Sequence, residues 1–126
     1  MRCFSTVASI FHISEASGWA EAQASGIYRR STLGRTVDEE GFIHCSHWGQ
    51  VEAVANAYYA GQRDLLLLVI DPARVAPEIR EEAVGLERFP HIYGPLNLDA
   101  VTEVRRFVTR EDGRLVAPDA PEEPDR

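Results

Sequence analysis

Lysine is absent from this chain, and all 13 of its basic residues are arginines. This absence excludes Schiff-base chemistry and the recognition of phosphate by a lysine side chain. Any anion would have to be bound by arginine, histidine or the N-terminus of a helix.

Cysteine is scarce, since Cys3 and Cys45 are the only two, and their spacing is typical of neither a disulfide framework nor a zinc site. A site built on His44, Cys45 and His47 is disfavoured, because Cys45 would face away from His44 on a strand. We therefore expect a reducing compartment, no metal, and a buried Cys45 rather than a nucleophile.

Long apolar runs are missing as well, since none approaches the roughly 20 residues that span a bilayer. The formal net charge is −7, which disfavours nonspecific binding to nucleic acid or to anionic membranes. We predict a cytoplasmic monomer with a single globular domain over residues 1–117 and a disordered acidic tail over residues 118–126.

The first half of the chain alternates strand-like and helix-like patterns. The predicted elements are a strand at 6–13 ending at His12, a helix capped by Ser14 or Ser17 and stopped by Gly26, a short strand at 27–30, a polar connector at 31–40, a strand at 40–46 and a helix at 47–60 capped by Ser46 and stopped by Gly61. The apolar face of the first helix is expected at Ala16, Trp19, Ala20, Gln23 and Ala24, and that of the second at Trp48, Val51, Ala55, Tyr58 and Tyr59.

The second half contains a continuous apolar run, Leu65–Ile70, which predicts a central strand buried on both faces. The other predicted elements are a turn at 71–72, a short strand or helix at 78–84 that we interpret as a strand, an aromatic loop at 89–95, a helical turn and strand within 99–108, and a hairpin turn at 111–113.

Two His-x-Ser segments, at His12–Ser14 and His44–Ser46, close predicted strands. Side chains two apart on a strand share a face, so each segment places an imidazole beside a hydroxyl. A helix beginning after Ser46 would also point its N–H groups toward His44, which suits an anionic or carbonyl group. We predict that His12, His44 and His91 line one polar cleft, with Ser14, Ser46 and Tyr93 beside them.

Four segments carry a family resemblance: the motif Gly41–Ser46, Gln50 and Ala53 on the following helix, the run Asp64–Pro72, and the aromatic segment Phe89–Leu96. Over about residues 9–106 the chain resembles the bacterial domain-of-unknown-function family 952, whose name carries no activity. That family looks like a remote member of the ADP-ribosyltransferase-like group. The resemblance implies an α+β fold of small, mostly antiparallel sheets with two helices, and a cleft for NAD between two of the sheets.

The same resemblance implies roles for individual residues in cleaving the nicotinamide glycosidic bond of NAD. His12 would hold a ribose hydroxyl, Tyr58 would stack on nicotinamide, and Glu82 would stabilise the oxocarbenium-like transition state. The expected catalytic residues are thus His12, His44 and Glu82. The expected ligand-binding residues are Ser14, Arg29, Ser46, Tyr58, His91 and Tyr93, with Arg29 on the pyrophosphate.

Two other functions fit the same residues. A non-catalytic module could bind a small metabolite or a protein partner through the same cleft. Two-histidine phosphoesterases place His-x-Ser or His-x-Thr on paired strands, with one imidazole as base and the other as acid. About thirty residues separate the pair here, and those enzymes generally need a longer, duplicated chain, so we rank this function lower.

Overall fold

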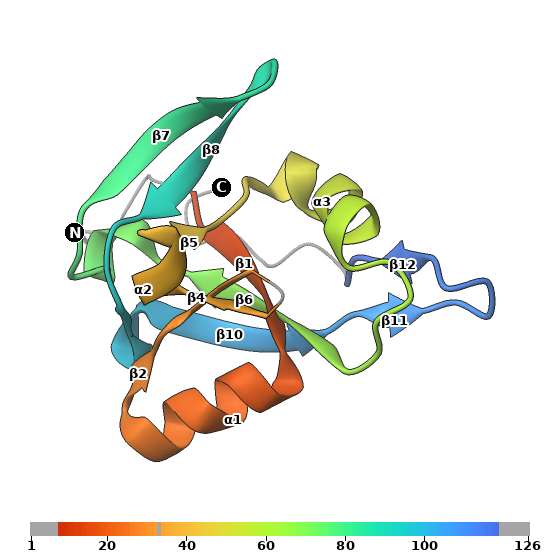
Figure 1. The fold of residues 1–126 in the computed structure, drawn as a ribbon, viewed down its shortest axis with the longest axis horizontal. Helices are drawn as coiled ribbons and strands as arrows, with labels where there is room; N and C mark the ends of the chain where they lie inside the picture. Colours follow the sequence, from red (N-terminus) through yellow and green to blue (C-terminus); the bar gives the residue numbers. More distant parts are fainter. Residues whose placement is uncertain (1–7, 33, 119–126) are drawn as a thin grey trace, which may run out of the picture.

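The computed structural model describes residues 8–32 and 34–118, and its fold is drawn in Figure 1. Two three-stranded sheets form its framework, and all of the strand pairs are antiparallel within the described residues. The predicted α+β class with small antiparallel sheets and few helices is confirmed. Apart from Pro118, the predicted tail lies outside the described residues.

The first sheet has the order β1-β6-β10, with β1 at Ile10–Glu15, β6 at Leu65–Ile70 and β10 at Val101–Arg106. All six residues of β6 are buried, which confirms the prediction of a central strand. The expected end of β1 at His12 was wrong, because its pairing with β6 continues to Glu15 opposite Leu65.

Side chains from the two faces of β6 enter two different hydrophobic clusters. Leu65, Leu67 and Val69 join the cluster that contains α3, whereas Leu68 and Ile70 join the cluster on the other face. This division follows from the alternation of side chains along a strand. The apolar run is thus long enough to supply two cores at once.

The second sheet has the order β5-β8-β7, with β5 at Ile43–His44, β7 at Ile79–Val84 and β8 at Glu87–Ile92. The strand interpretation of residues 78–84 is confirmed. In Figure 1 the β7–β8 hairpin rises from the body of the molecule as an arm.

The expected aromatic loop at 89–95 was wrong for its first half, because Phe89–Ile92 belongs to β8. Pro90 is compatible with this strand because it contributes a carbonyl, which accepts a hydrogen bond from the Cys45 N–H at 3.0 Å. The proline between aromatic residues is therefore the reason that this strand was predicted as a loop.

Helix α1, at Ala16–Ser25, ends at Gly26 as predicted, with φ 90° at that glycine, but its N-cap is Glu15 rather than a serine. Its buried residues are Gly18 and Ala22. The expected apolar face was wrong for Ala20, Gln23 and Ala24, which are exposed, but Trp19 is partly buried and packs against a hydrophobic cluster. A Cβ on Gly18 would lie 3.0 Å from Cγ of Arg30, which shows how closely this face packs. Besides Trp19, the helix packs through Gly18 and Ala22, two small residues that a hydrophobicity pattern hardly registers.

The expected polar connector at 31–40 contains three regular elements: β3 (Arg30–Thr32), β4 (Arg35–Thr36) and α2 (Val37–Glu40). Helix α2 has a capping box formed by Thr36 and Glu39. The Thr-x-x-Glu pattern was therefore a usable local signal. Gly41 ends the helix with φ 91° and turns the chain into β5.

The strand expected at 40–46 is shorter than predicted, and the helix after it starts later. Ser46 exchanges backbone hydrogen bonds with Phe11, which links the two sheets, and does not cap the helix. A 3-10 turn occupies Trp48–Gln50, and α3 runs over Val51–Tyr58. The helix N-terminus expected beside His44 is thus displaced, although Val51, Ala55 and Tyr59 are buried as predicted.

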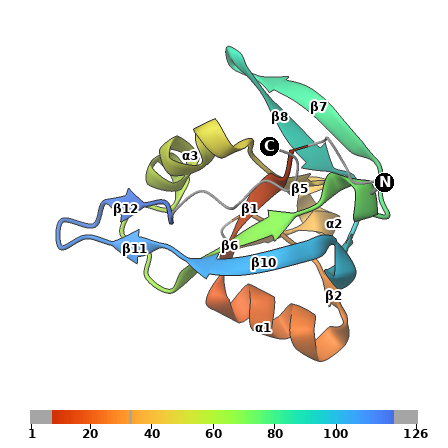
Figure 2. The same cartoon turned by 180° about the vertical axis from the view of Figure 1, so that it is seen from behind.

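The remaining elements connect this framework. They are β2 (Ile27–Tyr28), which pairs with β9 (Leu96–Asn97), the 3-10 turns Pro72–Arg74 and Leu98–Ala100, and the hairpin of β11 (Val108–Thr109) and β12 (Leu115–Val116). Seen from behind, β10 leads into this hairpin beyond the sheet (Figure 2). The helical turn, strand and hairpin turn predicted between 99 and 113 are confirmed. Within the ranges 8–32 and 34–118, no helix combines the length and the apolar character needed to cross a membrane.

Candidate functional site

A cavity of about 480 Å³ lies beside β5 and α3. Its apolar wall is formed by Phe42, Val54, Tyr58, Tyr59 and Val84. Its polar groups come from Thr32, Glu40, His44 and His91. The cavity thus pairs a largely aromatic wall with a small polar side that contains two imidazoles.

His44 and His91 meet because β5 and β8 pair with these two residues directly opposite each other. Facing residues of an antiparallel pair bring their side chains together. Nδ1 of His44 lies 3.2 Å from Nε2 of His91, within hydrogen-bond distance. Two histidines that are far apart in sequence therefore form one polar unit.

This polar unit continues through Glu82 on β7. Nδ1 of His91 lies 2.8 Å from Oε1 of Glu82, and the Tyr93 hydroxyl donates a hydrogen bond to the same oxygen. These bonds, the one from Tyr93 first and the one from His91 second, lower the pKa of the Glu82 carboxyl. Phe42 stacks on His91 with ring centroids 4.1 Å apart and holds the imidazole plane.

His44 is neutral at ordinary pH, because burial first and the electrostatic effect of neighbouring His91 second lower its pKa from 6.5 to about 4. Its Nε2 atom is shielded from solvent and has no hydrogen-bond partner among the described residues. A small recess of about 10 Å³, bordered by Ser46 among others, adjoins the His44 side chain. The recess and the cavity share His44, Val54 and Tyr59 as lining residues.

His12 lies close to His44, but its side chain makes its hydrogen bonds inside the fold. Its Nδ1 atom is 2.6 Å from the carbonyl oxygen of His44, and its Nε2 atom is 2.9 Å from the Tyr28 hydroxyl. Burial lowers the pKa of His12 from 6.5 to about 4. His12 borders a separate void of about 10 Å³ rather than the cavity, so both of its ring nitrogens are occupied within the fold.

The other expected site residues are spread around this centre. Ser14 donates its hydroxyl proton to the Glu15 carbonyl, and Ser46 borders the recess. Tyr58 is 63% exposed at the cavity wall. Arg29 is exposed and lies outside the described residues that line the cavity.

Six residues of the cavity were not predicted from the sequence: Thr32, Glu40, Phe42, Val54, Tyr59 and Val84. Phe42 stands two places before His44, so the alternation of side chains on a strand would have placed both on one face. Glu40 comes from α2, which lies within the segment predicted to be a polar connector. Tyr59 was assigned to the core, and it is both buried and in contact with the cavity.

Cys45 and the acidic and histidine residues were also compared with the needs of a metal ion. Among the described residues no group of three or more His, Cys, Asp or Glu side chains is arranged to hold one. Cys45 is fully buried, and burial raises the pKa of its thiol far above the ordinary value. A thiol of this kind is a poor nucleophile at neutral pH.

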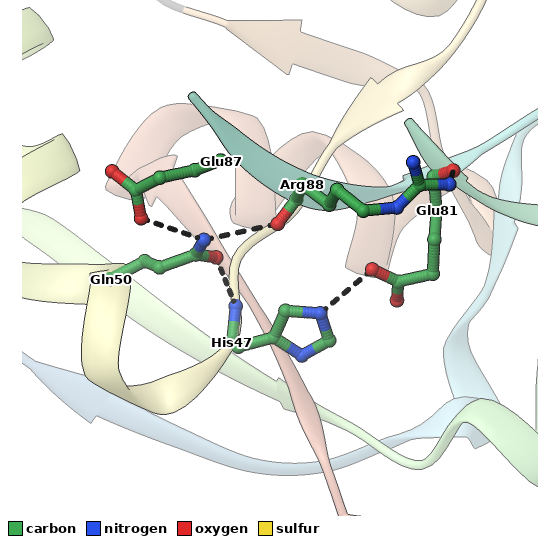
Figure 3. A network of polar contacts seen from close by, with 5 residues as sticks. All are labelled: His47, Gln50, Glu81, Glu87 and Arg88. Carbon is green, nitrogen blue, oxygen red and sulfur yellow. Dashed lines mark hydrogen bonds and ion pairs between the residues drawn. The ribbon is translucent and has the colours of Figure 1, made fainter. Parts of the chain in front are cut away.

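Polar contacts tie the β7–β8 arm to the start of α3 (Figure 3). Nε2 of His47 lies 2.9 Å from Oε1 of Glu81, and the Gln50 amide donates hydrogen bonds to Glu87 and to the Arg88 carbonyl. These contacts hold the strand that carries Glu82 against the segment that follows β5. The arm is thereby fixed at one side of the cavity.

Comparison with known proteins identifies solved structures of the same fold and a family, but it identifies no activity. The crystal structure of protein CC0527 from Caulobacter crescentus has a TM-score of 0.77 and 30% sequence identity, covering 86% of this chain and 93% of that one. Its solution NMR structure has a TM-score of 0.69 at 30% identity, covering 83% and 89%. No curated protein matches. Residues 13–104 match the family described as "Protein of unknown function (DUF952)", and the chain therefore belongs to the DUF952 family.

Proposed function

We propose that the cavity beside His44 binds a small organic molecule that carries a planar ring, and that NAD or an ADP-ribose-like nucleotide is the first ligand to test. One observation carries this proposal: an aromatic-walled cavity of about 480 Å³ has two coupled imidazoles on its polar side. Ligand sites in proteins commonly have volumes of about 300–1,000 Å³, apolar walls and a few polar groups.

The likeness of the family to the ADP-ribosyltransferase-like group favours nicotinamide as the ring. Phe42 and Tyr58 offer aromatic faces for stacking at the cavity wall. The ribose hydroxyl is assigned to His44 in this proposal, because both ring nitrogens of His12 are occupied within the fold.

Transfer of ADP-ribose would break the bond between nicotinamide nitrogen and ribose, with nicotinamide leaving with the electron pair. An acceptor hydroxyl or water would then attack the ribosyl cation and lose a proton. Glu82 lies behind His91, outside the described residues that line the cavity, whereas Glu40 lines it. Glu82 is therefore proposed as a positioning residue, and Glu40 as the carboxylate nearest the reacting bond.

The same placement of Glu82 favours a second candidate, a module that binds the ligand without turning it over. The phosphoesterase function is not proposed, because it needs two imidazoles that face one phosphate. His12 is buried and hydrogen-bonded to Tyr28, so this chain presents His44 and His91 to the cavity instead.

Calorimetric titration with NAD, ADP-ribose and nicotinamide tests the proposal on the wild type, on His44→Ala and on His47→Ala. His47 is the matched control, since it lies outside the described residues of the cavity wall and pairs with Glu81. We expect binding by the wild type and by His47→Ala, and affinity weaker by about tenfold or more in His44→Ala. No binding of any of the three compounds to the wild type would reject the nucleotide proposal.

Chromatographic detection of released nicotinamide then separates the two candidates. Release that depends on Glu40 supports transfer or hydrolysis, and Glu39→Gln is the control because Glu39 caps α2. Binding of NAD with no release supports the non-catalytic module.

A further inference from the structure

We infer that the ligand presents a hydrogen-bond donor, a hydroxyl or an N–H group, to Nε2 of His44, and that Tyr93, Glu82 and His91 impose this preference. The inference rests on the proposal that the cavity binds a ligand, but not on that ligand being a nucleotide. Its basis is which group donates and which accepts in the hydrogen bonds that link Tyr93, Glu82, His91 and His44.

The donor and acceptor roles are fixed first at Glu82. An ionised carboxylate can accept hydrogen bonds but cannot donate them. The Glu82 carboxylate lies within hydrogen-bond distance of both His91 Nδ1 and the Tyr93 hydroxyl. Both partners must therefore donate, which places a proton on Nδ1 of His91.

The roles at Glu82 then determine which nitrogen donates and which accepts in each of the two imidazoles. A neutral imidazole has one donor and one acceptor nitrogen, so neutral His91 accepts at Nε2. Its partner at 3.2 Å is Nδ1 of His44, which must then carry the proton. Neutral His44 is left with a lone pair on Nε2, the ring nitrogen with no partner among the described residues. An acceptor that is buried without a donor carries an energetic cost, which a ligand donor removes.

The recess beside His44 limits the size of the donor group. Its volume of about 10 Å³ is close to that of one water-sized group. A hydroxyl or amino group fits this space, whereas a phosphate group does not. The ring of the ligand is therefore assigned to the cavity, and its small donor group to the recess.

Long-range ¹H–¹⁵N correlation spectra of labelled protein read the tautomer directly, with His44→Gln used to assign the signals. We expect His44 to be protonated at Nδ1 at about pH 8. In Glu82→Gln, whose amide can donate as well as accept a hydrogen bond, a smaller fraction of His44 should be protonated at Nδ1. Glu81→Gln is the matched control, because Glu81 is the neighbouring acid and contacts His47 instead.

A His44 ring that keeps its proton on Nε2 at about pH 8 would overturn the inference, even if NAD binds. Equal fractions of His44 protonated at Nδ1 in Glu82→Gln and Glu81→Gln would also overturn it. The expected tautomers without any binding of NAD would leave the inference standing and reject only the nucleotide proposal.

A pair of small probes tests the ligand preference itself. Phenol and fluorobenzene have similar shapes, but only phenol has a donor. By ligand-observed NMR at about pH 8, we expect phenol to bind about tenfold more tightly, and the difference to disappear in His44→Ala. Equal binding of the two probes by the wild type would contradict the donor preference.

Discussion

At the scale of single residues, His12 and His44 show how one sequence pattern serves two purposes. Both belong to His-x-Ser segments, yet His12 holds the backbone carbonyl of His44 while His44 borders the cavity. Because a carbonyl only accepts, Nδ1 of His12 carries the proton, and Nε2 accepts from the Tyr28 hydroxyl. His12 is therefore a support for the strand that presents His44.

Removing the Tyr28 hydroxyl tests this support. In Tyr28→Phe, Nε2 of His12 loses its donor inside the fold. We expect the free energy of unfolding to fall by about 1–3 kcal/mol. Urea denaturation measures it, with Tyr58→Phe as the control, since Tyr58 is 63% exposed and its change should be near zero. Equal effects of the two substitutions would show that the buried hydrogen bond adds no stability.

His12 and His44 also make stability depend on pH. Their pKa values fall from 6.5 in the unfolded chain to about 4 in the folded protein, so the unfolded state binds more protons between these values. The free energy of unfolding should then be constant above about pH 6.5 and decrease by a few kcal/mol as the pH falls toward 4. Urea denaturation at several pH values measures this decrease. Equal stability at pH 7 and pH 5 would contradict the prediction.

At the scale of elements, the short strand β5 determines the site. Its two residues, Ile43 and His44, pair with Ile92 and His91 of β8, and this pairing creates the contact between the two imidazoles. Gly41 precedes the strand with φ 91°, a conformation that side chains with a Cβ rarely adopt. The turn at Gly41 therefore sets the direction in which Phe42 and His44 leave α2.

Gly41→Ala should lower the free energy of unfolding by about 1–2 kcal/mol, because alanine is strained in the left-handed region. Gly49→Ala is the matched control, since Gly49 has no positive φ and a Cβ there meets open space. Urea denaturation of both variants gives the comparison. A loss of stability as large in Gly49→Ala would argue against backbone strain as the cause.

Elements with a strong local pattern were predictable from sequence, and those that depend on distant partners were not. The run Leu65–Ile70 predicted a strand buried on both faces, and Gly26 predicted the end of a helix. Pro90 concealed β8, and α1 packs through Gly18 and Ala22, which carry almost no hydrophobic signal. The neighbouring positions of His44 and His91 depend on pairing between strands 47 residues apart, which no local pattern contains.

At the scale of the whole molecule, β6 connects two hydrophobic clusters that should unfold together. Trp48 packs against one cluster and Trp19 against the other. We expect Trp19→Phe and Trp48→Phe, each with one remaining tryptophan, to show fluorescence transitions in urea that coincide with the loss of circular dichroism. Transitions that separate in either variant would mean that the two clusters unfold independently.

The order of strands in the two sheets has a consequence for the origin of this fold. Cutting the chain after α3 would leave β1 and β5 on one fragment, and β6, β7, β8 and β10 on the other. Each sheet would then be divided between the fragments, since β1 pairs with β6 and β5 pairs with β8. Neither fragment holds a complete three-stranded sheet, so the two would have to associate in order to form this framework. A fusion of two self-sufficient halves at this point of the chain is therefore incompatible with this topology.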